Sequence, residues 1–226
     1  MKKKYFILIM FLVISIVALS KPASKGFTGL IDFPTAYNLR ISNYSVTGLI
    51  DHLEGNSKFG IMLEGGFIPQ IEAGIKLSSE DKLINQKLLK ANFKFQFVQE
   101  ADNPAMAIGF VEDEDVVYGY LVASKSIRKL LNKKIFLDTS VGLKYNENSE
   151  ASFFVGLGFP IFQKIKLLSE VYSYNSENKL GEKEKKISYN IGGEFYTTSN
   201  VSTKVFWREI DDSVGISISY TGIYDR

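Results

Sequence analysis

The sequence predicts an all-β fold: a single antiparallel, up-and-down transmembrane β-barrel of about twelve strands that follows a cleaved N-terminal signal peptide. Three observations support this prediction. Apolar and polar residues alternate with a period of two through most of the chain, several alternating stretches run for nine to twelve residues, and an export signal precedes them. A tilted strand needs about 9–11 residues to cross a bilayer, whereas strands of soluble proteins mostly have about five or six.

The first twenty residues have the organisation of a secretory signal peptide. Three lysines at positions 2–4 precede fourteen residues without a charge, and small side chains at Ala18 and Ser20 predict cleavage after Ser20. Fourteen apolar residues are too few for a spanning helix, which needs about 20. The prediction therefore divides the chain into a signal peptide (1–20), an N-terminal motif segment (21–43) that leads into the barrel, and a barrel domain (44–226).

The period-two alternation is clear in residues 187–195, where isoleucine, tyrosine and phenylalanine occupy odd positions and serine, asparagine and glutamate occupy even ones. Because successive side chains of a strand point to opposite faces, such a strand has one apolar and one polar face. Between residues 126 and 131 helical spacing leaves a short helix as an alternative to a loop. The expected strands cover residues 44–51, 58–66, 70–78, 87–98, 104–111, 116–124, 134–145, 151–159, 163–173, 186–196, 201–208 and 213–223.

Composition excludes several classes of activity. The 226 residues include no cysteine and one histidine, His52, which excludes disulfides, thiolate catalysis, cysteine zinc sites and a lipidated N-terminal cysteine. After removal of the three N-terminal lysines, 24 basic side chains stand against 25 acidic ones, so nucleic acid is not an expected partner. Nucleotide and hydrolase motifs are absent, and the acidic run 112–115 lacks the spacing of a calcium loop. We expect no enzyme activity, cofactor or metal site, and we expect His52 to be an exposed turn residue; a barrel enzyme that acts on lipids through His52 is a further alternative.

Alternation alone does not decide between a barrel in lipid and a soluble, periplasmic or secreted β-sandwich that binds a ligand, because both have strands with one apolar face. Strand length, an even strand number and aromatic residues near strand ends favour the barrel and the cell outer membrane. The aromatic residues expected in interfacial girdles are Phe97, Tyr145, Phe159, Tyr172, Tyr174, Tyr196, Trp207, Tyr220 and Tyr224.

In a barrel the polar faces line the lumen, where opposite charges are expected to pair across neighbouring strands. Outer-membrane lipid and the outer-membrane assembly machinery are the expected partners. The side chains expected to face the lumen are Glu72, Lys76, Lys90, Lys94, Asp138, Lys144, Glu170, Glu194, Lys204 and Arg208.

Several short motifs follow one another along the chain: TGLIDFPTA at 28–36, PQIEAG at 69–74, PAMAIG at 104–109, YLVASK at 120–125 and LSEVY at 168–172. Together and in this order they resemble the YjbH-like family of bacterial outer-membrane β-barrels, which is associated with exopolysaccharide production and secretion. The resemblance implies a non-enzymatic outer-membrane barrel of Gram-negative type, structural or transport-related, with a link to the envelope or its polysaccharide. The motif residues are Gly29, Ile31, Pro34, Thr35, Ala36, Glu72, Gly74, Pro104, Ala107, Gly109, Ser124 and Lys125.

Overall fold

The structure, a computed structural model, describes residue 23 and residues 28–53, 56–80, 89–113, 116–127, 136–146, 150–177 and 183–223. The predicted signal peptide and Tyr224 lie outside the described residues. Within the described ranges no helix is long and apolar enough to cross a membrane.

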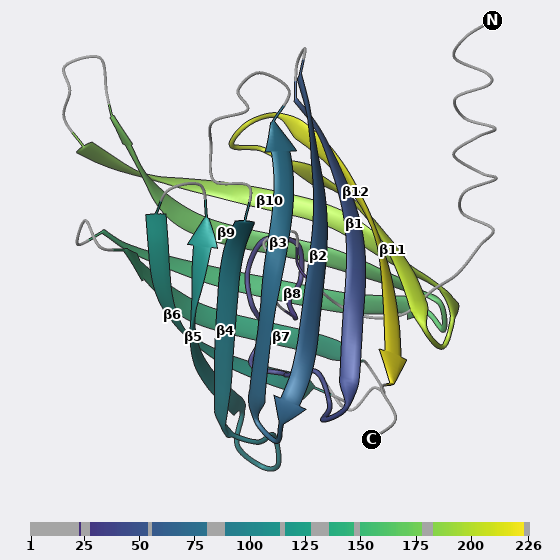
Figure 1. The fold of residues 1–226 in the computed structure, drawn as a ribbon. Coiled ribbons are helices and arrows are strands. Elements are labelled where there is room, and N and C mark those ends of the chain that lie inside the picture. Colours follow the sequence, from purple (N-terminus) through teal and green to yellow (C-terminus); the bar gives the residue numbers. More distant parts are fainter. Residues whose placement is uncertain are drawn as a thin grey trace, which may run out of the picture.

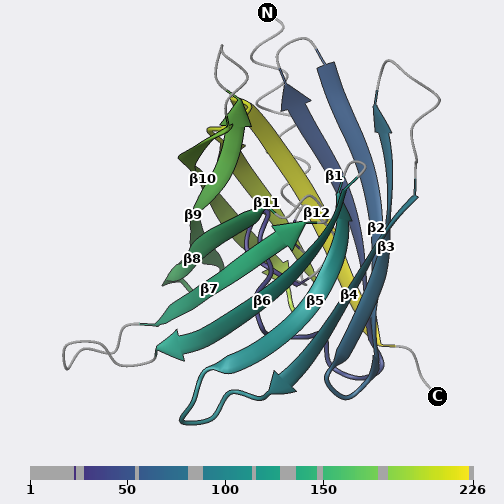
Figure 2. The same cartoon turned by 90° about the vertical axis from the view of Figure 1, so that its left-hand side faces the viewer.

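Twelve antiparallel strands form one closed barrel in which each strand pairs with its neighbours in sequence and β1 pairs with β12 (Figures 1 and 2). This closure confirms the predicted fold class, and the alternative of two packed sheets is wrong. Ser126 and Ile127, placed in a helix or loop by the sequence, extend β6; the rest of that link lies outside the described residues. The strands are β1 (Asn43–Leu53), β2 (Asn56–Ile68), β3 (Ile71–Glu80), β4 (Leu89–Val98), β5 (Ala105–Asp113), β6 (Val116–Ile127), β7 (Leu137–Asn146), β8 (Ala151–Phe162), β9 (Ile165–Glu177), β10 (Lys183–Thr198), β11 (Val201–Arg208) and β12 (Ser213–Ile223).

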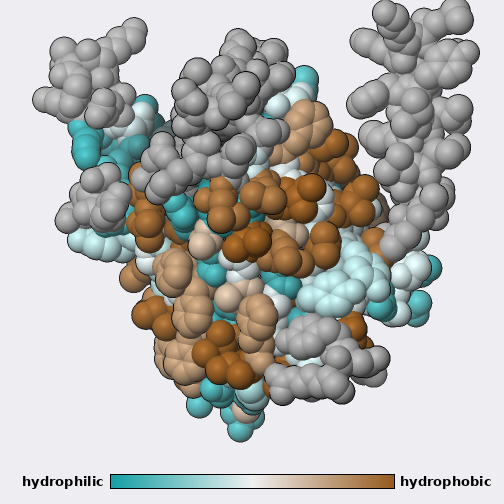
Figure 3. All heavy atoms as spheres, viewed as in Figure 1, coloured by the Kyte–Doolittle hydropathy of each residue, from teal (hydrophilic) through white to brown (hydrophobic). Residues whose placement is uncertain are grey.

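The outside of the barrel is apolar and the inside is polar, which is the reverse of a soluble protein. On β7, Val141 and Leu143 are more than half exposed while Ser140 is buried. Apolar side chains gather over the outer surface of the strands in Figure 3. Lipid, not water, is the solvent that such a surface requires. The outward apolar side chains include Ile61, Leu63, Ile75, Leu77, Phe95, Ile108, Leu121, Leu157, Leu167, Val171, Ile191 and Val214.

The predicted aromatic girdle is only partly correct. Phe97, Tyr145, Phe159 and Tyr220 are exposed on the outside, and Trp207 packs edge-on against the exposed ring of Tyr189. Three predicted members, in contrast, point into the lumen. The physical reason is the strand period, because each lies an even number of residues from a lumen carboxylate on its own strand. The inward residues are Tyr172 and Tyr174, which share the face of Glu170, and Tyr196, which shares the face of Glu194.

The lumen contains the segment that precedes the first strand. Residues 28–39 fold back inside the ring, and we call them the plug (purple trace in Figures 1 and 2). The plug contributes side chains to two apolar clusters within the barrel. Leu30 and Ile31 belong to one cluster, and Phe33 and Ala36 belong to the other. The core of this barrel is therefore the contact between the plug and the inner wall.

Candidate functional site: a plugged lumen and a charged vestibule

The plug contains a tight turn between Gly29 and Pro34, which form an isolated antiparallel bridge. Leu30 donates its N–H to the carbonyl of Phe33 at 3.1 Å, and Thr35 donates to the carbonyl of Thr28 at 3.1 Å. A Cβ at Gly29 would lie 2.3 Å from the Phe33 carbonyl oxygen. Only glycine fits this close approach of two backbone segments. Pro34 has no N–H to bond, which suits the edge of the turn.

The Glu170 carboxylate on β9 accepts hydrogen bonds from the backbone N–H groups of this turn. Oε1 accepts the N–H groups of Ile31, Asp32 and Phe33 at 2.8, 3.1 and 3.0 Å. Its second oxygen accepts the Asn190 side-chain amide at 2.9 Å. Glu170 is 1% exposed, so its charge is stabilised by these donors and not by water. Three successive N–H groups around one carboxylate form an anion-binding nest, built here from the chain's own N-terminal segment.

Glu72 on β3 and Lys94 on β4 hold the two ends of the plug together. Thr28 donates its N–H and its hydroxyl to the two Glu72 oxygens at 2.7 and 2.8 Å, and Leu39 donates its N–H at 2.7 Å. Lys94 Nζ donates to the carbonyls of Thr28 and Tyr37 at 3.2 and 2.7 Å, and also contacts the Thr28 hydroxyl. The two wall residues form an ion pair of 3.2 Å with fully buried side chains. Such a buried pair needs additional hydrogen bonds, and the plug backbone supplies them.

On β11, Lys204 and Arg208 complete the docking of the plug. Lys204 Nζ donates to the carbonyls of Gly29 and Leu30 at 3.1 and 2.6 Å. Arg208 Nε donates to both carboxylate oxygens of Asp32, at 3.0 and 2.8 Å, and its Nη1 lies 3.2 Å from Asp51 on β1. Arg208 therefore ties the tip of the plug to the first strand as well as to its own.

The end of the plug nearest the start of β1 binds β6 and the link between β4 and β5. Ala36 donates its N–H to Ser124 Oγ at 2.8 Å. The Tyr37 hydroxyl donates to Glu100 at 2.6 Å. Burial raises the pKa of Tyr37, and the neighbouring Glu100 carboxylate raises it further, so the phenol stays protonated and remains a donor. A wall glycine leaves room for the plug on the opposite side: a Cβ at Gly156 would lie 2.2 Å from a methyl carbon of Leu30.

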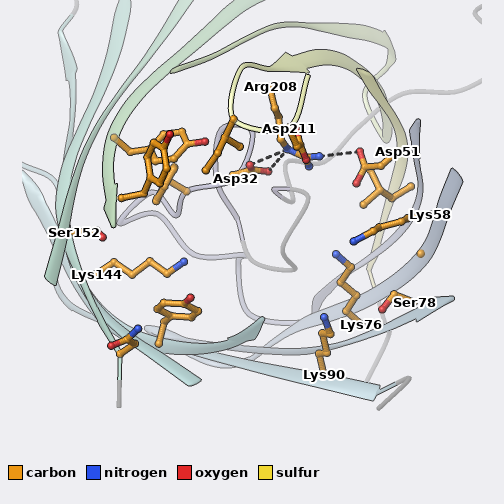
Figure 4. A pocket seen from close by; sticks show the side chains of 18 of the residues that line it. Asp32, Asp51, Lys58, Lys76, Ser78, Lys90, Lys144, Ser152, Arg208 and Asp211 are labelled. Atoms are coloured by element: carbon orange, nitrogen blue, oxygen red, sulfur yellow. Dashed lines mark hydrogen bonds and ion pairs between the residues drawn. The ribbon is translucent and has the colours of Figure 1, made fainter. Parts of the chain in front are cut away.

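Beyond the plug, toward the end of the barrel away from the first residue of β1, lies a cavity of about 470 Å³ that we call the vestibule. Its floor includes Asp32 and Phe33 of the plug, together with Arg208. Figure 4 shows the labelled lysine side chains pointing into it. Three of them come from one stretch of wall, and the fourth comes from the facing side. The lysines are Lys58 on β2, Lys76 on β3, Lys90 on β4 and Lys144 on β7.

Aromatic rings line the vestibule near Lys144. The ring of Phe33 lies 4.9 Å from that of Tyr172, which lies 6.4 Å from Tyr174, so three rings lead from the plug up the wall. Lys144 Nζ lies 3.5 Å from the centroid of the Tyr118 ring, a cation–π contact. One wall of the vestibule is therefore basic and the other presents aromatic faces.

At the rim of the vestibule, Lys183 donates to Glu150 at 2.6 Å. This hydrogen bond, assisted by Asn146, holds the pKa of the Glu150 carboxyl below its usual range, so it is ionised near neutral pH. At the other end of the barrel, Asp138 accepts hydrogen bonds from Lys166 at 2.5 Å and from Ser126 at 2.6 Å. This end of the lumen is occupied by paired charges.

The side chains that the sequence assigned to the lumen thus fall into three groups. Glu72, Lys94, Glu170, Lys204 and Arg208 hold the plug. Lys76, Lys90 and Lys144 line the vestibule, while Asp138 and Glu194 bind other wall side chains near the end at which β1 begins. The expected pairing across neighbouring strands occurs between Glu72 and Lys94, and four of the ten side chains, Glu72, Lys94, Glu170 and Lys204, bind the plug backbone.

The motif residues also meet around the plug. Glu72 and Ser124 bind plug N–H groups, and Ala107 packs in the same cluster as Ala36. Thr35 donates its hydroxyl to the Thr28 carbonyl at 3.3 Å. The remaining motif residues belong to the wall and its links. Gly74 faces Asn92 and Glu64, and Gly109 faces Tyr120. Pro104 directly precedes β5. Lys125 donates to the backbone carbonyls of residues 101–103.

His52 is exposed, and its ring Nδ1 lies 3.1 Å from the Ser57 hydroxyl across the β1–β2 hairpin. Its neighbour Asp51 points inward to Arg208, so the imidazole lies on the outer face and away from the vestibule. Among the described residues, no group of three or more histidine or carboxylate side chains is placed to hold a metal ion.

Comparison with known proteins identifies the fold. No protein-family model and no curated protein sequence matches the chain. Solved porin structures do match it. The KdgM porin has a TM-score of 0.57 at 7% identity, with 80% of this chain and 99% of that chain covered. The NanC porin has a TM-score of 0.55 at 9% identity, covering 80% of this chain and 100% of that chain.

At these identities the likeness shows a shared barrel fold. The chain shares the closed-barrel fold of these porins. Its closed ring and apolar exterior place it in the outer membrane, in contact with lipid.

Sequence reasoning did not identify several residues of the site. Asp32 lay inside a recognised motif, yet nothing in the motif indicated a partner on β11. Lys58 and Tyr118 share the inward face of predicted lumen residues on the strand with which each pairs, Lys76 on β3 and Lys144 on β7, and Asp51 is the register partner of Lys58. Counting residues across these hairpins would have placed them in the lumen.

Proposed function

We propose that the protein is a transport-related, non-enzymatic outer-membrane barrel whose passage is closed in this state by the plug. The observation that carries the proposal is the docking of residues 28–39 across the lumen through wall charges on β3, β4, β9 and β11. The irregular backbone of this buried segment needs hydrogen-bond partners, and the wall charges supply them. Here an irregular segment is held by reversible polar contacts, which is how movable elements are held in gated proteins.

The geometry supports transport in a second way. A barrel of twelve strands lies between small barrels filled by their own side chains and porins of 16–18 strands with open channels. The vestibule is open space on one side of the plug. Displacement of the plug would extend this space through the part of the lumen that the plug now occupies. His52 lies on the outer face, so its imidazole does not face a solute in the lumen.

The motif resemblance supports a role in the envelope. Motif residues from the plug, β3, β5 and β6 meet at one contact region, as expected if the YjbH-like pattern encodes a plugged barrel. We include membership of that family and a link to envelope or exopolysaccharide production in the proposal. A similar barrel, the KdgM porin, has been solved in complex with disordered oligogalacturonate, which favours a saccharide over other solutes. Insertion by the outer-membrane assembly machinery is part of the same proposal.

Ion conductance in planar lipid bilayers tests the transport function. The folded full-length chain is expected to be mostly closed, and the double variant Glu72→Gln, Glu170→Gln is expected to open more often, because neutral amides hold the plug N–H groups less strongly than carboxylates. Glu184→Gln, which removes an exposed carboxylate on β10, is the matched control. Equal conductance of wild type and double variant would assign the plug a structural role instead. Heat modifiability on detergent gels verifies that every variant is folded.

A further inference from the structure

A row of buried oxygen atoms crosses the inner wall from β12 through β1 and β2 to β4. In the strand register Thr221 pairs with Ser45, Ser45 with Glu64, Glu64 with Gly74, and Gly74 with Asn92. Each of the four polar side chains has a buried oxygen that finds no hydrogen-bond partner within the described part of the chain: Thr221 Oγ1, Ser45 Oγ, both carboxylate oxygens of Glu64, and Asn92 Oδ1. We call these four residues the oxygen row. Because buried polar atoms are normally hydrogen-bonded, the oxygen row points to a ligand.

Glu64 is the carboxylate of the oxygen row, and it is 2% exposed. Asn92 and Ser45 are buried as well. A Cβ at Gly74 would lie 2.9 Å from Glu64 Cγ and 2.9 Å from the Asn92 amide nitrogen, so the two side chains lean toward each other over this glycine. An ionised carboxylate that leaves water without a compensating partner is very costly. The ligand must therefore supply positive charge to Glu64.

The lysines nearest Glu64 serve other groups. The charges that act on Glu64 belong to Glu72, Lys94 and Lys204. Lys94 forms its ion pair with Glu72 and donates to plug carbonyls. Lys204 lies directly opposite Glu194 in the register of β10 and β11, and it also donates to plug carbonyls. Each lysine thus has a carboxylate of its own, and the charge of Glu64 is left over.

The plug covers the wall on both sides of Glu64. Met62, the preceding inward residue of β2, is fully buried in one apolar cluster with Leu30 of the plug. Gly66, the next inward residue, approaches the other end of the plug: a Cβ there would lie 2.8 Å from the Leu39 carbonyl oxygen. A ligand at Glu64 is therefore enclosed between the wall and the docked plug.

We propose that the oxygen row binds one Na⁺ ion, with Glu64 as its anionic ligand and Asn92 Oδ1 and Ser45 Oγ as neutral ligands. Carboxylate, amide and hydroxyl oxygens are hard ligands, which suit hard cations. A single carboxylate beside two lysines matches a monovalent ion, whereas sites with several carboxylates suit Ca²⁺. Because the plug encloses the site, the bound ion stabilises the docked plug by mass action. The site is additional to the proposed transport function and does not depend on it.

Equilibrium dialysis with radioactive sodium tests the site. The folded full-length chain in a sodium-free, non-ionic detergent is expected to bind one ion. Glu64→Gln is expected to bind it more weakly by about tenfold or more, because an amide oxygen replaces the charged ligand. The matched control is Glu184→Gln, which removes an exposed carboxylate on β10 and should bind sodium as wild type does. Absence of bound sodium, or equal binding by wild type and Glu64→Gln, would overturn the proposal.

Urea titrations in NaCl and in choline chloride of equal concentration test the same site through stability. The unfolding midpoint of wild type and of Glu184→Gln should be higher in NaCl, because choline supplies the same ionic strength but is too large for the site. Equal midpoints of wild type in the two salts would contradict sodium binding.

Ser45→Ala keeps the test decisive if Glu64→Gln does not fold, as judged by heat modifiability. It removes only a hydroxyl without a partner among the described residues, so the barrel should fold and bind sodium several times more weakly. Unchanged sodium binding in a folded Ser45→Ala would refute the assigned ligand set. No measurement here uses conductance, so a barrel that binds sodium but never conducts would refute the transport proposal alone.

Discussion

Lys90 and Lys94 lie on the same face of β4, four residues apart, yet they line different halves of the lumen. Lys94 is fully buried and donates to two plug carbonyls. Lys90 is partly exposed and lines the vestibule. Nothing in the strand itself distinguishes the two residues. The difference comes from what fills the lumen at each level.

The comparison shows how one wall serves two purposes. In the plugged half, the charged side chains replace water as hydrogen-bonding partners of an irregular backbone, so removal of one leaves buried groups without partners. In the vestibule, the lysines border an open cavity, so a group that loses a lysine partner there can bind water instead. We therefore expect substitutions of the same type to change stability strongly in the plugged half of the lumen and weakly in the vestibule.

The largest effect is expected for Glu170→Leu. The substitution leaves the N–H groups of residues 31–33 without their acceptor and leaves a buried site without its charge, at a cost of about 3–5 kcal/mol to plug docking. The strand ladders of β9 do not involve this side chain, so the barrel should still close. Limited proteolysis followed by mass spectrometry should show new cleavage within residues 28–39. Glu184→Leu is the control, and resistance of the Glu170 variant equal to that control would contradict the assigned anchor.

A smaller loss is expected for Gly29→Ala. The added methyl would lie 2.3 Å from the Phe33 carbonyl oxygen, and such overpacking costs about 1–3 kcal/mol. Hydrogen exchange of the amides of residues 31–33 should quicken accordingly. At Gly48 a Cβ would have no heavy atom within 4 Å, so Gly48→Ala should leave the exchange unchanged. Similar exchange in both variants would show that the turn tolerates the methyl.

At the border between the halves, Arg208→Lys should have an intermediate effect of about 1–2 kcal/mol. Lysine keeps the charge but cannot hold Asp32 and Asp51 with separate nitrogens of one planar group, as Arg208 does. The temperature at which the folded band disappears on a detergent gel should fall. Asp51→Asn, which removes only the β1 partner, should lower it less; the opposite ranking would mean that Arg208 mainly fastens the wall.

The smallest effect on stability is expected for Lys90→Gln. Relief of the repulsion from Lys76 should offset any lost contact, so the free energy of unfolding should change by less than about 0.5 kcal/mol. Lys94→Gln, four residues along the same face, should cost about 3–5 kcal/mol. Urea titrations of both variants in detergent measure the difference directly. Equal losses would remove the distinction between the two halves.

The barrel was predictable because its signal is local. Period-two alternation in a stretch such as 187–195 indicates which side chains share a face of the strand. The length of the strands then favours a barrel in lipid over a soluble sandwich. The same rule placed Lys94 and Glu170 on the inner face. The same period places Tyr172 and Tyr174 on the inner face, but the sequence analysis assigned them to an interfacial girdle because they lie near a strand end. Those two rings were misplaced because a positional trend was given more weight than the side-chain period.

The plug was not predictable in the same way. Residues 28–36 carried a recognisable motif, but their partners lie far away along the chain: Glu170 is 139 residues from Ile31, and Lys204 is 175 residues from Gly29. An irregular segment has no periodicity to indicate what it packs against. Only the assembled ring brings those wall positions to one point. The vestibule shares this property, since its basic and aromatic walls come from opposite sides of the barrel.

The docked N-terminal segment also has a mechanical consequence. Its contacts reach β3 and β4 on one side of the ring and β9, β10 and β11 on the other. The docked segment therefore braces the ring from both sides, and such a brace opposes flattening of the barrel by lateral pressure. Withdrawal of the plug would leave the barrel with a softer, more elliptical cross-section.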